Sequence, residues 1–509
     1  MKNIVVVGGG TAGWITALYT KMFFPHDNVT VIESSEIGIL GAGEGTTPIT
    51  IGTLNFLQIS TQSLIQNTKT TIKNGVKFTN WSKNKDFYHH SFILNGGDYH
   101  PFRMNWGLNN RIWNGPSISE IISIYNEKTR KEYDFHSIVC EKNKIFFIEK
   151  LNNEKNKSIE DFEILANYAI HFDAKDLADF LSKVGFQRGI YKIDGKVNNF
   201  ITDEKNNIKK IVLDNMEVEC DFIFDCSGFS RLIIGKFYNS EWESYSEHLP
   251  MKKAIPFFMD TNEKSIEPYT ESIAMNYGWM WKIPLQHRYG CGYVYDSNFL
   301  SDDNAKLELD KLIGYEVNSP RIINFNAGSY KRVWIKNCMA LGLSTGFIEP
   351  LEATSIMQLV TMLEIFFAER QNMFTENEKI KDIFNKRTKK HFEEILDFIY
   401  LHYMTDKQNN DFWKFFTKNN KIPSGLEEKI FLLNESILNN VGEIFTPWSY
   451  YVVADGIGFL NKENIKNIYQ KNNFGQKEML TFYNILLQNY EQASNNFIDH
   501  SYLLNYLKN

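Results

Sequence analysis

The amino-terminal segment constrains the fold of this chain more than any other part of its sequence. An apolar run occupies residues 3–7, the sequence Gly-Gly-Gly-Thr-Ala-Gly follows at 8–13, and a second, β-branched run at 28–32 ends at Glu33. A G-x-G-x-x-G pattern that leaves a buried strand and opens a helix is typical of a dinucleotide-binding β-α-β unit. We therefore expect strands at 3–7 and 28–32, joined by a helix over about 11–24.

Each part of this glycine pattern has a physical task. The first glycine permits a tight turn, the second lets a pyrophosphate approach backbone N–H groups, and the third lets the helix pack closely on the strand. The carboxylate at the end of the second strand accepts hydrogen bonds from a ribose. A chance glycine turn is the alternative, but the full strand-glycine-helix-strand context favours nucleotide binding. The residues predicted to bind the nucleotide here are Gly8, Gly10, Thr11, Ala12, Gly13 and Glu33.

The length, charge and aromatic content of the chain limit what else it can be. With 509 residues it is too long for one simple core, so we expect two lobes. The net charge of −6 argues against nucleic acid as a partner, because phosphate contacts need a basic face. An aromatic share of 15% leaves rings to line a pocket for a flat substrate after the cores are filled.

Cysteine spacing and the distribution of apolar runs indicate a reducing compartment. The five cysteines are scattered, with no CxxC or Cys/His ligand spacing, so neither a disulfide framework nor a metal site is indicated. The first apolar stretch is broken at once by glycines, unlike a signal peptide, and no uninterrupted apolar segment is long enough to span a bilayer. We therefore expect a soluble, cytoplasmic protein with no membrane partner.

The rest of the chain mixes helical and strand patterns, which predicts the α/β class. The glycine-rich segment 38–50 is not expected to form a regular element, and helical patterns follow it to about residue 75. Short strands separated by turn signals occupy 187–226, and strands dominate again from about 254 to 296. A long helix is expected over about 352–370.

A second segment favours FAD over NAD as the nucleotide. Residues 221–225 read as a buried strand, and the sequence Asp225-Cys-Ser-Gly-Phe229 is similar to the later FAD-contacting motif of flavoproteins with two dinucleotide-binding folds. Taken alone, this segment would be an ordinary strand followed by a turn. Together with the amino-terminal glycine pattern, it indicates a Rossmann-like, FAD-binding lobe of the glutathione-reductase type.

The two lobes are expected to be interleaved in sequence, with the second lobe mainly helical towards the carboxyl terminus. The FAD-binding lobe is assigned to 1–80, 160–235 and 325–370. The substrate-binding lobe is assigned to 81–159, 236–324 and 371–509.

Two specific motifs occur together in one known family. Residues 278–284 (Gly-Trp-Met-Trp-Lys-Ile-Pro) contain the signature W-x-W-x-I-P, and residues 342–354 contain the block G-x-x-x-x-F-x-E-P-L-E-x-T. Neither motif occurs widely in flavin hydroxylases. By these motifs the chain resembles the flavin-dependent tryptophan halogenases, which are two-component enzymes that use FADH₂. The resemblance extends from about residue 3 to 458.

Other segments carry the same resemblance. Residues 41–48 are similar to the flavin-proximal loop of the family, and 73–81 are similar to the segment that holds its essential lysine. Residues 100–102 and 448–451 are similar to segments of its substrate lobe.

The resemblance implies that an oxidised halogen is passed from flavin to lysine. Reduced FAD and O₂ form a C4a-hydroperoxide, a halide (chloride, bromide or iodide) attacks its distal oxygen, and the hypohalous acid is relayed to Lys73 for electrophilic halogenation of an aromatic substrate. Lys73 acts through a hydrogen bond or as a haloamine, and the sequence leaves both open. Trp279 and Trp281 point to the same face of a strand and would keep the substrate away from the flavin. Without the resemblance, the tryptophans would be core residues and the lysine a surface group.

The resemblance also assigns roles around the long helix. Glu352 is expected to begin that helix and to stabilise the cationic ring intermediate or accept its proton, although a carboxylate there could simply cap the helix. Thr354 and Ser355 are expected to bind halide through backbone N–H groups. The other implied cofactor-binding residues are Ala42, Gly43, Glu44, Asp225 and Gly342. The implied substrate-binding residues are His100, Pro101, Phe102, Tyr450 and Tyr451.

The sequence departs from the family at two places. Residues 353–355 (Ala-Thr-Ser) replace the usual Ser-Thr-Gly, which leaves the preferred halide open. After the Tyr-Tyr pair, the carboxylate and aromatic pair with which tryptophan-specific members grip the amino acid are not evident, although Asp455 could substitute. Free tryptophan, a different indole and a phenol therefore all remain candidate substrates.

The implied partner is a separate flavin reductase, because no second nicotinamide-binding fingerprint is evident. The oligomeric state stays open, with a homo-oligomer as one option. Two alternatives to a halogenase also stay open: a flavin-dependent aromatic hydroxylase (monooxygenase), and a non-catalytic flavoprotein that has kept the fold. A hydroxylase would not need Lys73, the tryptophan pair and Glu352 together.

Overall fold

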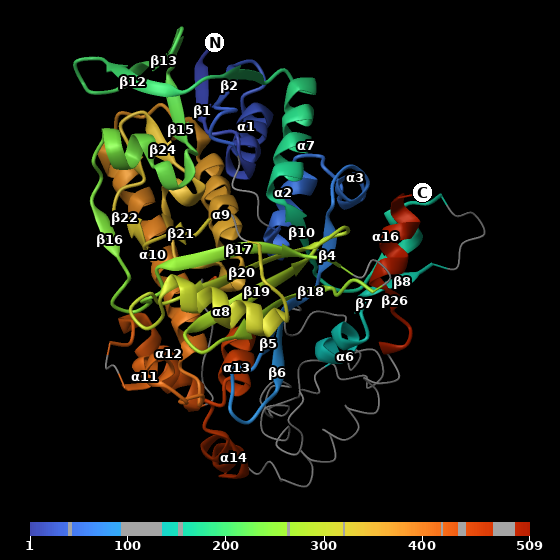
Figure 1. Cartoon of the computed structure of the whole chain (residues 1–509). Helices are drawn as coiled ribbons and strands as arrows, with labels where there is room; N and C mark the ends of the chain where they lie inside the picture. Colours follow the sequence, from blue (N-terminus) through green and yellow to red (C-terminus); the bar gives the residue numbers. More distant parts are fainter. Residues whose placement is uncertain are drawn as a thin grey trace. The chain divides into compact units, whose positions relative to one another are not determined.

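The computed structural model forms two compact units, each assembled from three segments that are distant in sequence (Figure 1). The first unit comprises Met1–Lys69, Phe172–Ser246 and Asn326–Glu393, and the second comprises Thr70–His171, Glu247–Phe325 and Glu394–Asn509. The structure describes residues 1–38, 43–92, 135–150, 156–261, 265–318, 321–418, 421–435, 444–471 and 494–508. The assignment of FAD to one unit and of substrate to the other stays a prediction.

A six-stranded sheet forms the centre of the first unit. Its strand order is β11-β2-β1-β15-β24-β23, with bounds β1 Asn3–Val7, β2 Asn28–Glu33, β11 Tyr191–Asp194, β15 Phe222–Asp225, β23 Trp334–Ile335 and β24 Cys338–Ala340. The neighbours from β11 to β24 pair in parallel, and β23 pairs antiparallel with β24. Strands buried on both faces of a parallel sheet read as continuous apolar runs, as β1 and β15 do. The prediction of an α/β fold with a dinucleotide-type opening is confirmed.

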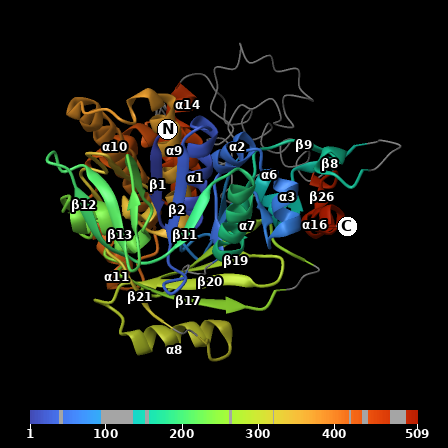
Figure 2. The same cartoon turned by 90° about the horizontal axis from the view of Figure 1, so that it is seen from above.

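Helices that pack on this sheet join its strands. α1 (Thr11–Phe23) connects β1 to β2, and α7 (Ala174–Gln187) leads into β11. Figure 2 shows α7 beside β11 and β2. Gly185 of α7 allows close packing on α1, because a Cβ at this position would lie 2.7 Å from the ring of Trp14.

A small second sheet of the first unit contains β12 (Val197–Thr202), β13 (Ile208–Leu213) and β14 (Glu217–Glu219). These strands confirm the alternating strands predicted for this part of the chain.

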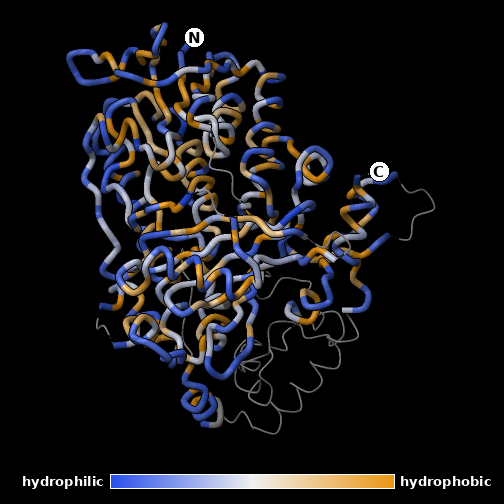
Figure 3. The backbone as a smooth tube through the Cα atoms, in the orientation of Figure 1, coloured by the Kyte–Doolittle hydropathy of each residue, from blue (hydrophilic) through white to orange (hydrophobic). Residues whose placement is uncertain are grey.

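Helix α9 (Thr354–Ala368) is mainly hydrophobic, whereas the turn between β12 and β13 is hydrophilic (Figure 3). A helix that is apolar on most of its sides belongs in a core, and most residues of α9 are buried.

The segment 38–50, which was expected to be irregular, contains regular structure, so this prediction was wrong. It includes the short strand β3 (Gly43–Gly45) and the start of helix α2 (Pro48–Phe56). Pro48 occupies the first turn of α2, where its fixed φ suits a helix and its missing N–H has no intrahelical partner to lose.

The helical pattern predicted to about residue 75 ends earlier, so this prediction was also wrong. The last helix is α3 (Thr61–Asn67), and strands β4 (Thr71–Lys73) and β5 (Gly75–Thr79) follow it. Two β-branched residues begin β4, and such residues favour extended backbone. The deciding factor is a partner strand about a hundred residues away in sequence, which local periodicity does not reveal.

A seven-stranded sheet forms the centre of the second unit. Its order is β21-β17-β20-β19-β18-β5-β6, with bounds β6 Phe87–Ser91, β17 Lys253–Met259, β18 Tyr269–Ala274, β19 Gly278–Pro284, β20 Tyr289–Tyr295 and β21 Ile323–Asn324. Helices wholly within this unit are α6 Phe135–Glu141, α8 Asp302–Ile313, α11 Asp411–Lys418, α12 Ser424–Asn434, α13 Pro447–Gly456, α14 Lys462–Lys471 and α16 His500–Lys508. The strands predicted for 254–296 are confirmed.

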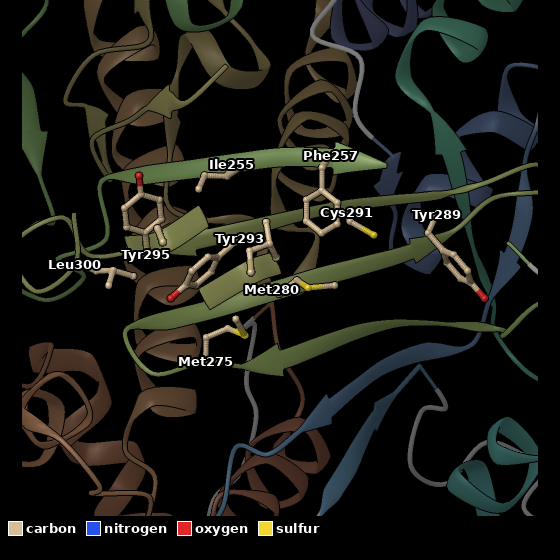
Figure 4. Close-up of a cluster of buried hydrophobic side chains, with 11 residues drawn as sticks. Ile255, Phe257, Met275, Met280, Tyr289, Cys291, Tyr293, Tyr295 and Leu300 are labelled. Atoms are coloured by element: carbon tan, nitrogen blue, oxygen red, sulfur yellow. The ribbon is translucent and has the colours of Figure 1, made fainter. Parts of the chain in front are cut away.

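The two faces of the β19–β20 pair carry different side chains. Met280 pairs with Tyr293, and both belong to an apolar cluster that includes Leu309 of α8 (Figure 4). Side chains alternate between faces along a strand, so Trp279 and Trp281 point to the opposite face. The predicted common face of the two tryptophans follows from this register.

The close contact between Trp281 and its cross-strand neighbour can be tested by substitution. Gly292 lies opposite Trp281, and a Cβ there would lie 2.1 Å from the indole ring. Gly292→Ala is expected to displace the ring and to lower the free energy of unfolding by about 1–3 kcal/mol. Gly52→Ala in α2 is the control, because a Cβ there meets no atom within 4 Å and alanine favours a helix. Urea unfolding followed by tryptophan fluorescence measures both effects. Equal stability of the two variants would contradict the expected overpacking.

Candidate functional site

The glycine loop after β1 is packed too closely for larger residues. Gly8 has φ +122°, and a Cβ there would lie 2.1 Å from the backbone oxygen of Cys226. A Cβ on Gly13 would lie 1.8 Å from the backbone oxygen of Gly8. The N–H of Gly8 donates to the carbonyl of Ile32 over 2.8 Å. The loop therefore approaches the backbone of β2 and of the turn after β15 closely, which the absence of side chains permits.

The start of α1 offers hydrogen-bond donors to an anion. Its N-cap residue, Gly10, has no side chain, and a Cβ placed there would meet no atom within 4 Å. Among the described residues, no hydrogen-bond partner exists for the buried hydroxyl of Thr11. The first N–H groups of a helix and its dipole attract phosphate. The backbone of Gly10, Thr11 and Ala12 thus fits the pyrophosphate of FAD.

The carboxylate of Glu33 lies against the same loop. A Cβ on Gly9 would lie 1.7 Å from Oε2 of Glu33, so only glycine fits where the carboxylate crosses the loop. Oε1 of Glu33 forms an ion pair with Lys192 of β11. The carboxylate is therefore oriented at the end of β2, where a dinucleotide ribose binds in folds of this kind. Lys192 was not predicted, because its role depends on β11 lying next to β2.

Asp225 holds its own loop together. Its Oδ1 accepts hydrogen bonds from the N–H of Ser227 (3.1 Å) and from the hydroxyl of Ser227 (2.6 Å). Its Oδ2 accepts from the N–H groups of Ile233 (2.9 Å) and Ile234 (3.0 Å). These four bonds order the turn after β15, and a direct contact between Asp225 and the cofactor stays a prediction.

A third loop, which follows β24, reaches the start of α1. Gly342 has φ +63°, and a Cβ on it would lie 2.9 Å from the Cβ of Ala12. The hydroxyl of Ser344 donates to the carbonyl of Gly228 over 3.3 Å. The loops after β1, β15 and β24 therefore meet at the carboxyl ends of neighbouring parallel strands, where open α/β sheets bind nucleotides.

Glu44 of β3 has a shifted protonation equilibrium. Burial, and then the nearby carboxylate of Asp173, raises the pKa of Glu44 to about 7. A carboxyl group with such a pKa exchanges a proton near neutral pH, which is a property of many functional sites. Gly43 directly precedes it in β3. Of the predicted site residues, Ala42, His100, Pro101 and Phe102 lie outside the described residues.

The start of α9 differs from the prediction. Pro350–Glu352 forms a 3₁₀ turn, Ala353 has φ +57°, and α9 begins only at Thr354. The expectation that Glu352 begins the long helix was therefore wrong, because the left-handed backbone of Ala353 separates the 3₁₀ turn from α9. A non-glycine residue in this left-handed region costs about 1–2 kcal/mol, so the surrounding structure must hold it there.

The residues predicted to bind halide form the first turn of α9. Thr354 is buried and Ser355 is half-buried. The N-cap residue, Ala353, has no polar side chain with which to cap the helix, so the first N–H groups of α9 keep their donor capacity for an anion. Halide binding at this turn stays a prediction.

Lys73 of β4 is fully buried in the second unit, with an exposed fraction of 0%. Lysine is rarely buried to this extent unless its amine has a partner or a function. β4 pairs antiparallel with β10 (Ala169–Asp173), and the small residue Ala169 lies opposite Lys73. Nζ of Lys73 lies 5.0 Å from the centroid of the Phe92 ring, within reach of a cation–π interaction.

His171 of β10 lies on the same face of this strand pair as Lys73. Its cross-strand partner is Thr71, which precedes Lys73 by two positions. The hydroxyl of Thr71 donates to the carbonyl of Pro284 (2.7 Å), so Nδ1 of His171 donates to Thr71 Oγ1 (3.1 Å). Nε2 of His171 then accepts from the hydroxyl of Thr270 (2.9 Å). Burial, and then nearby positive charge, lowers the pKa of His171 well below its usual range, so the ring is neutral.

His500, the first residue of α16, contacts the same strand. Its Nε2 accepts a hydrogen bond from the N–H of Ile72 (2.9 Å), and its Nδ1 donates to the carbonyl of Ile266 (3.0 Å). These two partners fix the neutral tautomer with its proton on Nδ1. Burial lowers the pKa of His500 to about 4. No local sequence pattern points to either histidine.

Trp279 and Trp281 form a buried aromatic pair with ring centroids 6.1 Å apart. The indole N–H of Trp279 has no hydrogen-bond partner within the described part of the chain. Across the sheet, Trp281 pairs with Ser272, which pairs with Phe78, which in turn pairs with Tyr88. Directly paired residues share a face, so Trp281 and Tyr88 lie on the same side of the sheet.

Helix α13 packs on that side. A Cβ on Gly456 would lie 2.3 Å from the ring of Tyr88, so the helix and the sheet are in close contact. Tyr450 and Tyr451 of α13 are both buried, and the ring of Tyr450 lies 5.2 Å from that of Phe398. The structure therefore places the tryptophan pair and the two tyrosines predicted to bind substrate on one face of the same sheet.

Asp455 forms ion pairs with two lysines. Its carboxylate lies 2.5 Å from Nζ of Lys85 and 2.7 Å from Nζ of Lys462. Although burial raises the pKa of Asp455, these two charges lower it more, so the net shift is downward. Asp455 is thus part of an internal ion cluster and is not a free carboxylate for a substrate ammonium group.

The predicted residues fall into two groups, one in each unit. The glycine loop, Glu352 and Thr354 belong to the first unit, whereas Lys73 and the tryptophan pair belong to the second. No helix in the described ranges combines the length and the apolar character needed to cross a membrane.

The neutral state of His500 predicts how stability depends on pH. A histidine whose pKa is lower in the folded than in the unfolded chain takes up its proton first in the unfolded state, so stability is lost as pH falls below about 6.5. Between pH 7.5 and 5, His500 alone should lower the free energy of unfolding by about 2 kcal/mol. His500→Gln, which keeps an acceptor but does not titrate, should show a correspondingly smaller loss in urea unfolding. Identical pH dependence of the two proteins would contradict a neutral His500.

Comparison with known proteins places these features in a family. A family model described as tryptophan halogenase matches residues 3–471. The tryptophan 7-halogenase RebH of Lentzea aerocolonigenes is 30% identical over 440 residues, which cover 84% of this chain and 81% of that protein. The tryptophan 6-halogenase ThaL of Streptomyces albogriseolus is 26% identical over 524 residues, or 94% of each chain. The structure of BrvH, a flavin-dependent halogenase from Brevundimonas sp. BAL3, matches with a TM-score of 0.81 at 28% identity and covers 100% of this chain and 99% of that one.

The family match includes the glycine loop, β4, the tryptophan strand and the start of α9, and so covers parts of both units. This chain therefore belongs to the tryptophan halogenase family, a family of flavin-dependent enzymes that halogenate aromatic substrates.

Proposed function

We propose that this chain oxidises halide with the help of reduced FAD and O₂ and uses the product to halogenate an indole- or phenol-like small molecule. Reduced FAD, when bound, would supply two electrons to O₂ and the halide would supply two more, so that one oxygen atom would end in hypohalous acid and the other in water. The aromatic ring would then exchange a proton for halogen, and the oxygen of the hypohalous acid would leave as water with that proton. A separate flavin reductase would regenerate FADH₂.

The observation that carries this proposal is the buried amine of Lys73. Most lysines are solvated surface groups, whereas Lys73 lies in a strand pair and has no exposed surface. Its amine would bind hypohalous acid by a hydrogen bond or, when neutral, become a haloamine, and either species presents an electrophilic halogen to a ring. The Phe92 ring, whose centroid lies 5.0 Å from Nζ, places an apolar surface beside the amine. Such a surface would exclude water from the reaction.

Two groups of the first unit would support the chemistry at other steps. The N–H groups at the first turn of α9, at Thr354 and Ser355, would bind the halide before its oxidation. Glu352, with an exposed fraction of 2%, would stabilise the cationic ring intermediate or accept the ring proton.

The substrate is proposed to lack the free amino-acid group that a carboxylate would recognise at Asp455. That carboxylate already binds two lysines, so it has no remaining role for an ammonium group. The aromatic side chains on the face that carries Trp281 suit a flat apolar ring. Indoles and phenols that lack an amino-acid group are the candidates of this kind.

One assay tests the reaction itself. The chain, a flavin reductase, FAD and NADH are mixed with a panel of aromatic compounds and with chloride, bromide or iodide in turn, and products are analysed by mass spectrometry. Halide-dependent products with the mass and isotope pattern of a halogenated ring are expected. A hydroxylated product that forms equally without halide would identify an aromatic hydroxylase, and the lack of any product would favour a non-catalytic flavoprotein.

Substitution of Lys73 tests its role directly. Lys73→Met should lower the yield of halogenated product by more than about 100-fold, because the oxidised halogen loses the amine that presents it. FAD binding and NADH oxidation by the reductase should be unchanged. Lys77→Met is the matched control, because Lys77 lies in the next strand, β5, and forms an ion pair with Glu141. Halogenated product from Lys73→Met at the wild-type rate would remove Lys73 from the mechanism.

A further inference from the structure

Residues that are distant in sequence hold the backbone on both sides of Lys73. The carbonyl of Thr70 accepts a hydrogen bond from Nε2 of Gln286 (2.6 Å), and the N–H of Asn74 donates to the carbonyl of Pro268 (2.6 Å). The carbonyl of Asn74 accepts from the N–H of Phe92 (3.1 Å). β4 is therefore a short strand whose position is set almost entirely by other parts of the second unit.

Two neutral imidazoles complete this set of contacts. β4 is the edge strand of its sheet, and an edge strand presents N–H groups that have no partner strand. His500 accepts from one of them, the N–H of Ile72, which directly precedes Lys73. On the opposite strand, His171 donates to the hydroxyl of Thr71, two residues before Lys73.

Each histidine also has a second, independent anchor. Nδ1 of His500 donates to the carbonyl of Ile266, and the N–H of Ile266 donates to the hydroxyl of Ser501. The first two residues of α16 are therefore both bonded to the backbone of Ile266. Nε2 of His171 accepts from the hydroxyl of Thr270 in β18. Each ring therefore bridges β4 to a separate element, with one nitrogen for the strand and one for the anchor.

We propose that His500 and His171 are positioning residues for Lys73, which hold β4 so that the amine meets the oxidised halogen in one orientation. This inference rests on the proposed function of Lys73. The two histidines act through backbone and hydroxyl groups of β4 and do not act on the substrate.

The physical basis of this role is geometric. Reactions between two bound groups require the reacting atoms to be aligned, and a displacement of about 1 Å can cost about 100-fold in rate. The Lys73 side chain is long and flexible, so the position of its Cα decides which orientations its amine can reach. Neutral imidazoles fix the strand without supplying a carboxylate that would pair with the amine and compete for the halogen species.

Paired amide substitutions separate the two bonds that each ring makes. The amide oxygen and nitrogen of Gln are separated from Cα by the same number of bonds as Nε2 of histidine. The amide oxygen and nitrogen of Asn are separated from Cα by the same number of bonds as Nδ1. His500→Gln therefore keeps the bond to Ile72, whereas His500→Asn keeps only the bond to Ile266. In the same way, His171→Asn keeps the bond to Thr71, whereas His171→Gln keeps only the bond to Thr270. Each pair thus contains one variant that retains its contact with β4 and one that does not.

The first measurement is amide hydrogen exchange of the peptide that contains β4 in the FAD-loaded protein. His500→Asn is expected to speed exchange in this peptide by about 10-fold or more, because the N–H of Ile72 loses its acceptor. His500→Gln is expected to stay within about twofold of wild type. Equal exchange in the two variants would show that His500 does not hold β4 and would overturn the proposal.

The second measurement is halogenation, with kcat and KM determined for an accepted aromatic substrate. The variants that lose contact with β4, His500→Asn and His171→Gln, should lose about 10- to 100-fold in kcat with KM changed less than about threefold. The hypohalous acid that is no longer used should appear in a scavenger assay, at unchanged NADH consumption. His500→Gln and His171→Asn should restore kcat to within about threefold of wild type.

His248→Gln is the matched control, because His248 also belongs to the second unit and its Nδ1 lies 2.7 Å from the carbonyl of Lys421, away from β4. It should leave kcat and the exchange of β4 unchanged. Equal loss of kcat in both members of each pair would indicate a purely structural role and overturn the proposal, as would full kcat in all four variants. A wild-type chain that makes no halogenated product would overturn the proposed function, and with it this role, even where hydrogen exchange shows the contact.

Discussion

The burial of one amine, that of Lys73, sets the demands that the surrounding structure must meet. Removal of an ammonium group from water is costly, so a lysine with no exposed surface needs a compensating environment. Here that environment contains an aromatic ring and uncharged hydrogen-bonding groups in neighbouring strands. The strand pair β4–β10, the end of β19 and the first residue of α16 converge on this place, although they are far apart in the sequence.

The first unit is organised by a different constraint, which is close approach of backbone. At Gly8, Gly13 and Gly342, a single additional carbon would overlap atoms of Cys226, Gly8 and Ala12, respectively. This packing draws three strand ends together and leaves helix N–H groups for phosphate. The ion pair with Lys192 orients the carboxylate of Glu33 at the edge of that site. The tightest packing of the two units thus depends on opposite features: on glycines without side chains in the first unit, and on a fully enclosed lysine side chain in the second.

The sequence was most informative where structure depends on local pattern. The glycine loop and Glu33 were predictable because strand, turn and helix follow one another directly. The role expected of Lys73 came from a family motif, whereas its strand conformation was missed because the partner strand is remote. His171 and His500 lie 100 and 428 positions from their partners in β4, so no local pattern could identify them. The start of α9 was misplaced because nothing in the sequence marks Ala353 as left-handed.

The choice of imidazole at β4 follows from the chemistry proposed for the amine. A carboxylate in the place of His171 would also accept from the hydroxyl of Thr270, but it would carry a charge that binds an ammonium group. A lysine held in an ion pair would be stabilised as a cation and would give up its hydrogen-bonding capacity to the carboxylate. A neutral ring fixes the strand through one donor and one acceptor and adds no charge of its own beside Lys73. The lowered pKa of both histidines, which results mainly from burial, keeps this arrangement intact at neutral pH.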